Sequence, residues 1–200
     1  MPERIAYEGQ VQAAAPSPVR ILGLGGSMRA NSHSLAVLKA ALAMGQKAGA
    51  DTVLADIRVL DLPVYNPDWQ LDSYPETLAR LLEDARRADG YILCSPTYHG
   101  TVTGSLKNTL DALEFLGRDT PPYFAGKLVG LIAVGGGAQN VINSLLHTAR
   151  TLNGLVVPTA VAVPHGAVDG DTGLVTDTAI QHRLQSMMDQ LIDYAVRLKR

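Results

Sequence analysis

The chain has 200 residues, the length of one domain of ordinary size. Hydrophobic residues make up 46% and charged residues 18%, which is typical of a globular α/β protein. The formal net charge of −2, with both signs spread along the chain, argues against electrostatic binding of nucleic acid. The single cysteine, Cys94, excludes an internal disulfide and any zinc or iron–sulfur site built from cysteines. It indicates a reducing cytoplasm as the setting.

The N-terminal region differs from the rest of the chain. No apolar run reaches the roughly 18 to 20 residues that span a membrane, and the N-terminus lacks the apolar core of an export signal. Residues 1–18 show no periodic pattern and end in Pro16-Ser17-Pro18. We predict a poorly ordered arm over residues 1–18 and a single domain over residues 19–200.

From Val19 onward, apolar runs alternate with segments of helical periodicity. The runs are rich in Val, Ile and Leu without in/out alternation, which is typical of buried parallel strands. Pro158 predicts an edge or a bulge in the last of them. Five strands alternating with five helices predict a mostly parallel sheet covered on both faces. The expected strands are 19–25, 52–60, 91–95, 128–134 and 155–163, and the apolar helix faces include Leu38, Leu82, Leu110, Leu145 and Leu191.

The loop after the first expected strand, from Gly25 to Ser34, combines two glycines, three serines and an arginine. A helix N-terminus preceded by small hydroxyl residues binds anions, because the free N–H groups and the helix dipole point in the same direction. Arg29 can add a charge-assisted hydrogen bond to a phosphate. The predicted phosphate ligands are therefore Ser27, Arg29, Ser32 and Ser34.

Simple helix capping by Ser32 or Ser34 is the alternative interpretation of this loop. Capping alone, however, does not call for an arginine among three serines after two glycines. The dinucleotide pattern G-x-G-x-x-G fails because Met28 stands at its third glycine, and the pattern G-x-x-x-x-G-K-[ST] is missing. A monophosphate at the first strand–helix junction of a doubly wound sheet indicates FMN, at the switch point of the strand order 2-1-3-4-5.

A second loop, Ser95-Pro96-Thr97-Tyr98-His99-Gly100, lies between the third expected strand and a helical pattern. Such a turn places a flat aromatic wall next to free backbone N–H groups, which suits a planar ligand with polar edges such as a flavin ring. Gly135-Gly136-Gly137 heads the fourth expected helix, and its N–H groups are candidates to stabilise negative charge on a reduced flavin. The alternative is an ordinary turn made flexible by glycine.

Other polar and aromatic residues carry weaker signals. Cys94 is expected to pack as a small buried residue, and Asn108 to support the loop by side chain–backbone hydrogen bonds. The aromatic residues Tyr65, Trp69 and Tyr74 are interpreted as the lining of a substrate mouth, a subunit contact or a hydrophobic plug. Four histidines show no ligand spacing and are expected to be structural or on the surface: His33, His147, His165 and His182.

Together these motifs resemble those of the NADPH-dependent FMN reductase family. Residues 26–32 resemble its G-S-x-R-x-x-S loop. The stretch from Ser95 to Asp111 is similar to its S-P-x-Y-x-G…G-x-L-K-N-x-x-D signature, and Gly135 to Gly137 stand where the family has its third flavin loop. The resemblance covers about residues 19–165 in matching order.

This resemblance implies a flavodoxin-like fold and a homodimer or homotetramer. By position, Ser27, Arg29, Ser32 and Ser34 would hold the FMN phosphate, Pro96, Thr97, Tyr98, His99 and Gly100 would flank the ring, and Gly135, Gly136 and Gly137 its far edge. The chain departs from the family pattern at Ser34, often Asn, at Thr97, often Glu, and at Val134, often Ser or Thr. These departures leave the preferred substrate open.

The sequence thus predicts an enzyme that moves a hydride from NADPH or NADH to N5 of FMN, and on to a flavin, a quinone or a similar small-molecule acceptor. FMN serves as bound cofactor or as substrate, and neither a catalytic side chain, a metal, nucleic acid nor a membrane is expected to take part. One alternative is a flavin-binding electron carrier, which calls for a strongly acidic surface and a Thr-rich phosphate loop that the sequence lacks. The other, a redox-sensing module, rests on Cys94 alone.

Overall fold

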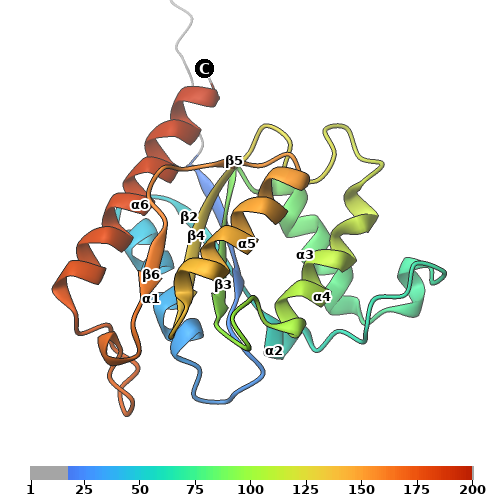
Figure 1. Cartoon of the computed structure of the whole chain (residues 1–200). Coiled ribbons are helices and arrows are strands. Elements are labelled where there is room, and N and C mark those ends of the chain that lie inside the picture. The colour runs from blue at the N-terminus through green and yellow to red at the C-terminus, as the bar shows by residue number, and fades with distance from the viewer. Residues whose placement is uncertain (1–17, 200) are drawn as a thin grey trace, which may run out of the picture.

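A parallel sheet forms the centre of the molecule, whose residues 18–199 are described by a computed structural model (Figure 1). The predicted arm at residues 1–18 lies outside the described residues except for Pro18. The strands are β1 (Arg20–Gly25), β2 (Asp51–Asp56), β3 (Gly90–Pro96), β4 (Leu128–Val134), β5 (Leu155–Val156) and β6 (Val161–Val163). All pairings are parallel, in the order β2-β1-β3-β4-β5, with β6 also paired to β4. The predicted flavodoxin-like order 2-1-3-4-5 is confirmed.

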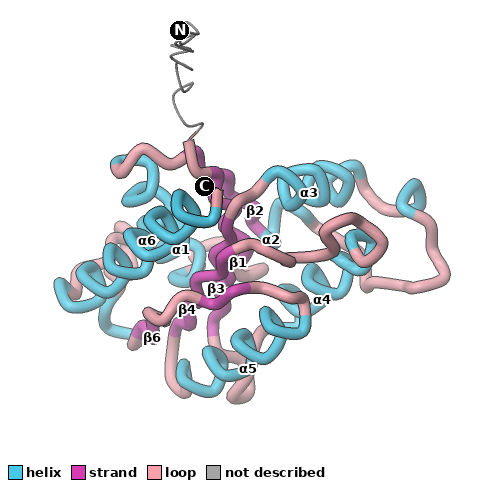
Figure 2. Tube along the Cα trace, turned by 90° about the horizontal axis from the view of Figure 1, so that it is seen from above, coloured by secondary structure: helices cyan, strands magenta, loops and turns pink. Residues whose placement is uncertain are grey.

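Helices cover both faces of this sheet. They are α1 (His33–Lys47), α2 (Ile57–Leu60), α3 (Glu76–Arg87), α4 (Gly104–Ala112), α5 (Ala138–Thr151) and α6 (Thr178–Leu198). Seen from above, α1 and α6 lie on one side of the strands, and α3, α4 and α5 lie on the other (Figure 2). Short 3₁₀ turns occupy Leu71–Ser73, Leu113–Leu116 and His165–Ala167. This three-layer arrangement is the one that the alternating pattern predicts.

Two hydrophobic clusters, one on each face, hold the layers together. On one face Val37 and Leu38 of α1 pack in a cluster with Leu184 of α6; on the other, Leu82 of α3 packs in a cluster with Leu106 of α4. All five side chains are completely buried, so truncating one of these leucines to alanine is expected to cost about 2–5 kcal/mol. Within the described residues, no helix combines the length and apolar character needed to cross a membrane.

The second strand is shorter than the sequence predicts. It ends at Asp56, whose Oδ1 accepts a hydrogen bond from the N–H of Arg58 at 3.0 Å and so caps α2. Ile57 and Leu60, which the expected strand included, are both buried on that single helical turn. The prediction was wrong for residues 57–60 because a short apolar run fits a strand and a helical turn equally well.

The fifth strand is divided in two around Pro158, where the sequence predicts an edge or a bulge. β5 and β6 both pair with β4, which aligns Leu128 with Leu155 and Ile132 with Val161. Between β5 and β6, a side chain takes the place of the backbone pairing with β4. The N–H of Thr159 donates to Oε1 of Gln190 on α6 at 3.0 Å. The two short strands thus share the fifth position of the expected sheet.

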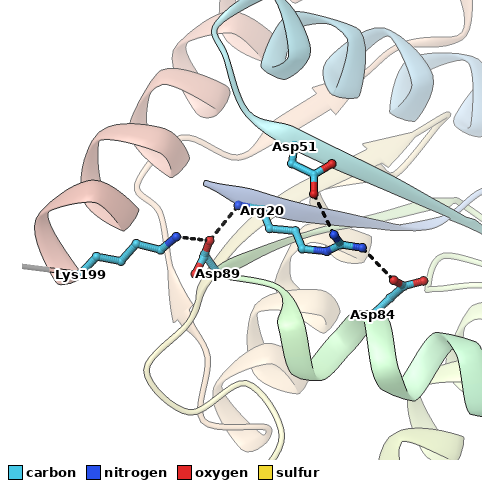
Figure 3. A network of polar contacts seen from close by, with 5 residues as sticks. All are labelled: Arg20, Asp51, Asp84, Asp89 and Lys199. Atoms are coloured by element: carbon cyan, nitrogen blue, oxygen red, sulfur yellow. Dashed lines mark hydrogen bonds and ion pairs between the residues drawn. The ribbon is translucent and has the colours of Figure 1, made fainter. Parts of the chain in front are cut away.

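At the amino-terminal edge of the sheet, a polar network joins several elements (Figure 3). The Arg20 guanidinium forms ion pairs with Asp51 at 2.8 Å and Asp84 at 3.0 Å. The Arg20 N–H donates to Asp89 Oδ2 at 2.7 Å, and the same oxygen contacts Lys199 Nζ at 2.6 Å. The network therefore connects β1, β2, α3, the turn before β3 and the end of α6.

Candidate functional site

Three loops that the sequence marks as functional begin at one edge of the sheet. They follow the carboxyl ends of the neighbouring strands β1, β3 and β4. The register aligns Gly25 with Cys94, and Pro96 with Val134. The fold therefore brings the predicted phosphate loop, the Ser95–Gly100 loop and the Gly135–Gly137 loop to the same edge, which is where ligands bind in open α/β sheets.

The phosphate loop leaves β1 in close contact with β3. A Cβ atom at Gly25 would lie 2.1 Å from the carbonyl oxygen of Cys94, so only glycine fits there. Gly26 has φ of +99°, in the region that favours glycine, and its N–H donates to the same carbonyl oxygen at 3.2 Å. The two glycines thus allow the chain to turn sharply toward α1.

The serines of the phosphate loop are engaged mainly with one another and with α1. Ser32 is the N-cap of α1, and its Oγ accepts from the N–H of Leu35 at 3.2 Å. Ser34 is buried, and its Oγ lies 2.9 Å from that of Ser32. Ser27 Oγ accepts from the N–H of Arg29 at 3.3 Å. The capping interpretation therefore describes Ser32, and Ser34 completes the cap.

Donors suited to an anion remain at this end of α1. Within residues 18–199, the N–H groups of His33 and Ser34 contact no acceptor, as is usual for the first turn of a helix. Arg29 is exposed and forms no ion pair with another described residue. The helix dipole adds to their attraction for negative charge. The loop therefore offers a phosphate backbone donors and a guanidinium.

The second loop is a tight hairpin. Tyr98 and Thr101 exchange two backbone hydrogen bonds, each of 3.1 Å, around His99 and Gly100. Those two residues have φ of +50° and +79°, as in the two-residue hairpin turns that favour positive φ at both central positions. His99 thus occupies a central position of the turn. The ring of Tyr98 next to it is 50% exposed.

The hydroxyl groups of Ser95 and Thr103 anchor this hairpin to α4, and Thr103 is a residue that the sequence did not single out. Ser95 is completely buried, and its Oγ accepts from the N–H of Thr103 at 3.1 Å. Thr103 in turn is the N-cap of α4 and accepts from the N–H of Leu106. At the other side, the hydroxyls of Thr101 and Ser144 lie 3.2 Å apart. The hairpin is therefore anchored to both α4 and α5.

The hydroxyl of Thr97 lies at the junction of the second and third loops. Its Oγ1 is buried and has no hydrogen-bond partner among the described residues. The Thr97 side chain is 3.7 Å from the positions that Cβ atoms would occupy at Gly135 and Gly137. An unpaired buried hydroxyl is unfavourable, so this atom is available to pair with a polar ligand group.

The third loop uses two of its three N–H groups within the protein. The N–H of Gly135 donates to the Val163 carbonyl at 2.8 Å, and that of Gly136 donates to Nε2 of His165 at 3.2 Å. No side chain caps α5, and the N–H groups of Gly137, Ala138 and Gln139 have no acceptor within the described chain. The free N–H groups therefore begin at the last glycine of the predicted triplet and continue into the first turn of α5.

Comparison with known proteins identifies the family of the chain. The sequence model of the NADPH-dependent FMN reductase family matches residues 19–168, three quarters of the chain. The chain belongs to this family. An NAD(P)H-dependent FMN reductase of Pseudomonas aeruginosa is 28% identical over 178 residues, which cover 84% of this chain and 93% of that relative. An FMN-dependent NADPH-azoreductase of Staphylococcus saprophyticus is 32% identical over 183 residues, with coverage of 84% and 91%.

A solved structure of another protein has the same fold as this chain. The flavoenzyme NAD(P)H:(acceptor) oxidoreductase FerB of Paracoccus denitrificans superposes with a TM-score of 0.71 at 22% identity, over 90% of this chain and 98% of that chain. At this identity the likeness speaks for the fold alone. It agrees with the observed strand order.

The residues present fit the FMN that the family implies. Free N–H groups at the head of α1 and the exposed Arg29 suit its phosphate, and the unpaired Thr97 hydroxyl suits a polar atom of its ring system. The uncapped first turn of α5 suits negative charge. No cluster of three or more metal-ligating side chains occurs among the described residues. The free N–H groups and Arg29 therefore suit a negatively charged ligand.

Several residues near the site have other roles. Asn108 forms the expected side chain–backbone hydrogen bonds, but to the segment after β2: its Oδ1 accepts from Tyr65 N–H at 2.7 Å and its Nδ2 donates to the Pro63 carbonyl at 2.8 Å. Tyr74 is buried and contacts the rings of Tyr65 and Trp69. This segment therefore packs as a hydrophobic plug, with the Trp69 ring 42% exposed at its outer side.

Cys94 is a buried thiol and not a redox centre on the surface. Its Sγ donates to the Ser34 carbonyl oxygen at 3.2 Å. Complete burial raises the pKa of the Cys94 thiol far above its usual range, so little thiolate forms at neutral pH. The expectation that Cys94 packs as a small buried residue is confirmed.

Proposed function

We propose that the protein is an NAD(P)H-dependent oxidoreductase that uses FMN and passes reducing equivalents to a flavin, a quinone or a similar acceptor. One observation carries the proposal: in a member of the FMN reductase family, the unpaired Thr97 hydroxyl and the free N–H groups of α1 and α5 belong to loops at one sheet edge. An electron carrier without nicotinamide turnover is not favoured, because the named relatives are reductases.

Within this proposal, residues 19–200 form the FMN-binding domain, and each loop holds one part of the cofactor. Arg29 and the N–H groups of His33 and Ser34 bind the phosphate, with Ser27 and Ser32 shaping the loop around it. Ser34 supports the cap through Ser32. The remaining proposed contacts, to the ring and its far edge, come from Pro96, Thr97, Tyr98, His99, Gly100, Gly135, Gly136 and Gly137.

When bound, FMN supplies the redox chemistry, the acceptance of a hydride from a nicotinamide and its delivery to an acceptor. The protein contributes placement and electrostatics. The exposed face of Tyr98 provides an aromatic surface beside the ring. The N–H groups of Ala138 and Gln139, aligned with the α5 dipole, stabilise negative charge without reorganising. No side-chain nucleophile is needed.

The test is a titration of the apoprotein with FMN, followed by steady-state turnover with NADPH and with NADH. FMN should bind with quenching of its fluorescence, and turnover should follow. Parallel reciprocal plots are expected if FMN stays bound between half-reactions, whereas intersecting plots indicate that it acts as a dissociating substrate. A protein that neither binds FMN nor oxidises a nicotinamide in its presence would contradict the proposal.

We further propose that the protein works as a homodimer or homotetramer in a reducing cytoplasm. A hollow of about 580 Å³ between α4, α5 and the segment after β2 offers a partner surface lined by Tyr65, Leu110 and His147. The exposed Trp69 lies on the same segment. The free thiol of Cys94 suits reducing conditions. Light scattering after gel filtration measures the mass, and a 21.2 kDa particle would contradict the oligomer.

A further inference from the structure

The pairing of β6 with β4 places His165 against the third loop. β6 pairs with the end of β4, which aligns Val163 with Val134, and the Gly135 N–H extends that pairing to the Val163 carbonyl. Two residues later, Nε2 of His165 accepts a hydrogen bond from the N–H of Gly136 at 3.2 Å. Its Cε1 lies 3.2 Å from the position that a Cβ atom would occupy at Gly135. The imidazole thus lies directly against the glycine loop.

The backbone that presents this imidazole is itself fixed. His165 begins a 3₁₀ turn in which the N–H of Ala167 donates to the Pro164 carbonyl at 3.1 Å. Ala167 is buried, and its carbonyl accepts from the N–H of Thr176 at 2.9 Å. A rigid segment therefore holds an acceptor against three consecutive glycines, the residue type with the greatest backbone freedom.

We propose that His165 is a positioning residue of the FMN site, which acts by holding Gly136 in place. Because Nε2 accepts a hydrogen bond, the neutral imidazole carries its proton on Nδ1. The bond orders Gly135 to Gly137 before the ligand arrives and directs the free N–H groups of Ala138 and Gln139 toward it. A preordered loop binds with a smaller loss of entropy. This inference rests on the proposed binding of FMN.

The sequence pattern predicts that His165 is a structural or surface residue. Its side chain is indeed exposed, and for that reason its removal should disturb the core very little. A residue that only stabilises the fold would change the melting temperature of the apoprotein. A positioning residue should instead change the affinity for FMN while the apoprotein melts almost as before.

The experiment compares three variants of the full chain as apoproteins titrated with FMN. His165→Leu removes the acceptor, whereas His165→Gln retains one in the side-chain amide oxygen. His182→Leu is the matched control, because His182 is exposed on α6 and forms no side-chain hydrogen bond within the described residues. The dissociation constant should rise about 5- to 10-fold for His165→Leu, as expected for one hydrogen bond. It should change less than about twofold for the other two variants.

A second measurement tests the contact without FMN. Amide hydrogen exchange of ¹⁵N-labelled apoprotein should be several-fold slower at Gly136 in the wild type than in His165→Leu. Affinity in His165→Leu equal to that of the wild type, equal loss in the Leu and Gln variants, or an unprotected Gly136 amide in the wild type would each overturn the inference. Failure of the wild type to bind FMN would instead overturn the proposed function, so the two failures are distinguishable.

Discussion

Polar groups are paired differently at the amino-terminal and carboxyl-terminal edges of the sheet. At the amino-terminal edge, the Arg20 N–H and the two terminal guanidinium nitrogens of its side chain are paired with carboxylates within the chain (Figure 3), whereas its buried Nε has no hydrogen-bond partner among the described residues. At the carboxyl-terminal edge, the Thr97 hydroxyl and the first N–H groups of α1 and α5 are unpaired among the described residues. Most polar groups at the first edge are thus paired internally, whereas several at the second have no partner among the described residues.

Lys127 shows the same tendency toward internal pairing at the amino-terminal edge. Its Nζ donates to the carbonyls of Ala85 and Arg86, at 2.6 and 2.8 Å, and so satisfies the end of α3. Burial lowers the pKa of the Lys127 ammonium group from its ordinary value. Substitutions at this edge should therefore change folding, and substitutions at the other edge should change binding.

Arg29→Ala should show the largest difference between the effect on FMN binding and the effect on folding. Loss of a charge-assisted hydrogen bond to phosphate, about 1.5–3 kcal/mol, should raise the dissociation constant of FMN by about 10- to 150-fold. The melting temperature of the apoprotein should stay nearly constant, because Arg29 is exposed and has no ion pair among the described residues. Fluorescence titration and calorimetry measure the two quantities.

Arg58→Ala, which removes an exposed arginine from α2, is the control for this variant. It should leave FMN binding unchanged. Equal loss of affinity and of stability in Arg29→Ala would indicate that Arg29 supports the fold of the loop instead of contacting the phosphate.

Arg20→Ala, at the amino-terminal edge, should lower the stability of the fold and leave FMN binding unchanged. Its guanidinium forms two ion pairs while only 23% of the side chain is exposed, so the variant should lose about 1–2 kcal/mol of unfolding free energy. FMN affinity per folded molecule should not change. Urea unfolding measures the loss of stability. Arg80→Ala is the control, because Arg80 forms an exposed ion pair, and it should cost less than about 0.5 kcal/mol.

Thr97→Val should move stability and binding in opposite directions. The variant removes a buried hydroxyl that has no partner among the described residues, so the apoprotein should be as stable as the wild type or slightly more stable. FMN should bind about 3- to 10-fold more weakly, because the hydroxyl loses its role toward the ligand. A variant that loses stability without FMN but binds it normally would show that the hydroxyl has an internal partner.

Cys94 gives the smallest effect, which appears only at alkaline pH. Burial raises the pKa of its thiol in the folded protein, so the folded state keeps a proton that the unfolded state loses above about pH 8.5. The free energy of unfolding should therefore be constant below that pH and fall by about 1 kcal/mol between pH 8 and 9.5. Urea unfolding at a series of pH values should show a smaller fall for Cys94→Ala, and parallel pH profiles would contradict this assignment.

Local sequence patterns determined the class of fold and the location of the site. Uninterrupted apolar runs such as Leu128–Val134 predicted buried strands in a sheet covered on both sides, and helical spacing of leucines predicted the covering layers. Glycines and hydroxyl residues at the strand ends marked the loops that we propose to bind a ligand. These features are encoded by neighbouring residues, so they can be read along the chain.

Only the tertiary structure decided which groups at the site are free. His165 meets Gly136 across 29 positions, and this contact depends on how β6 aligns with β4 after the interruption at Pro158. In the same way, Asn108 holds a segment 43 positions away. Hydrogen bonds between distant segments are set by register and packing, and no local periodicity in the sequence records them.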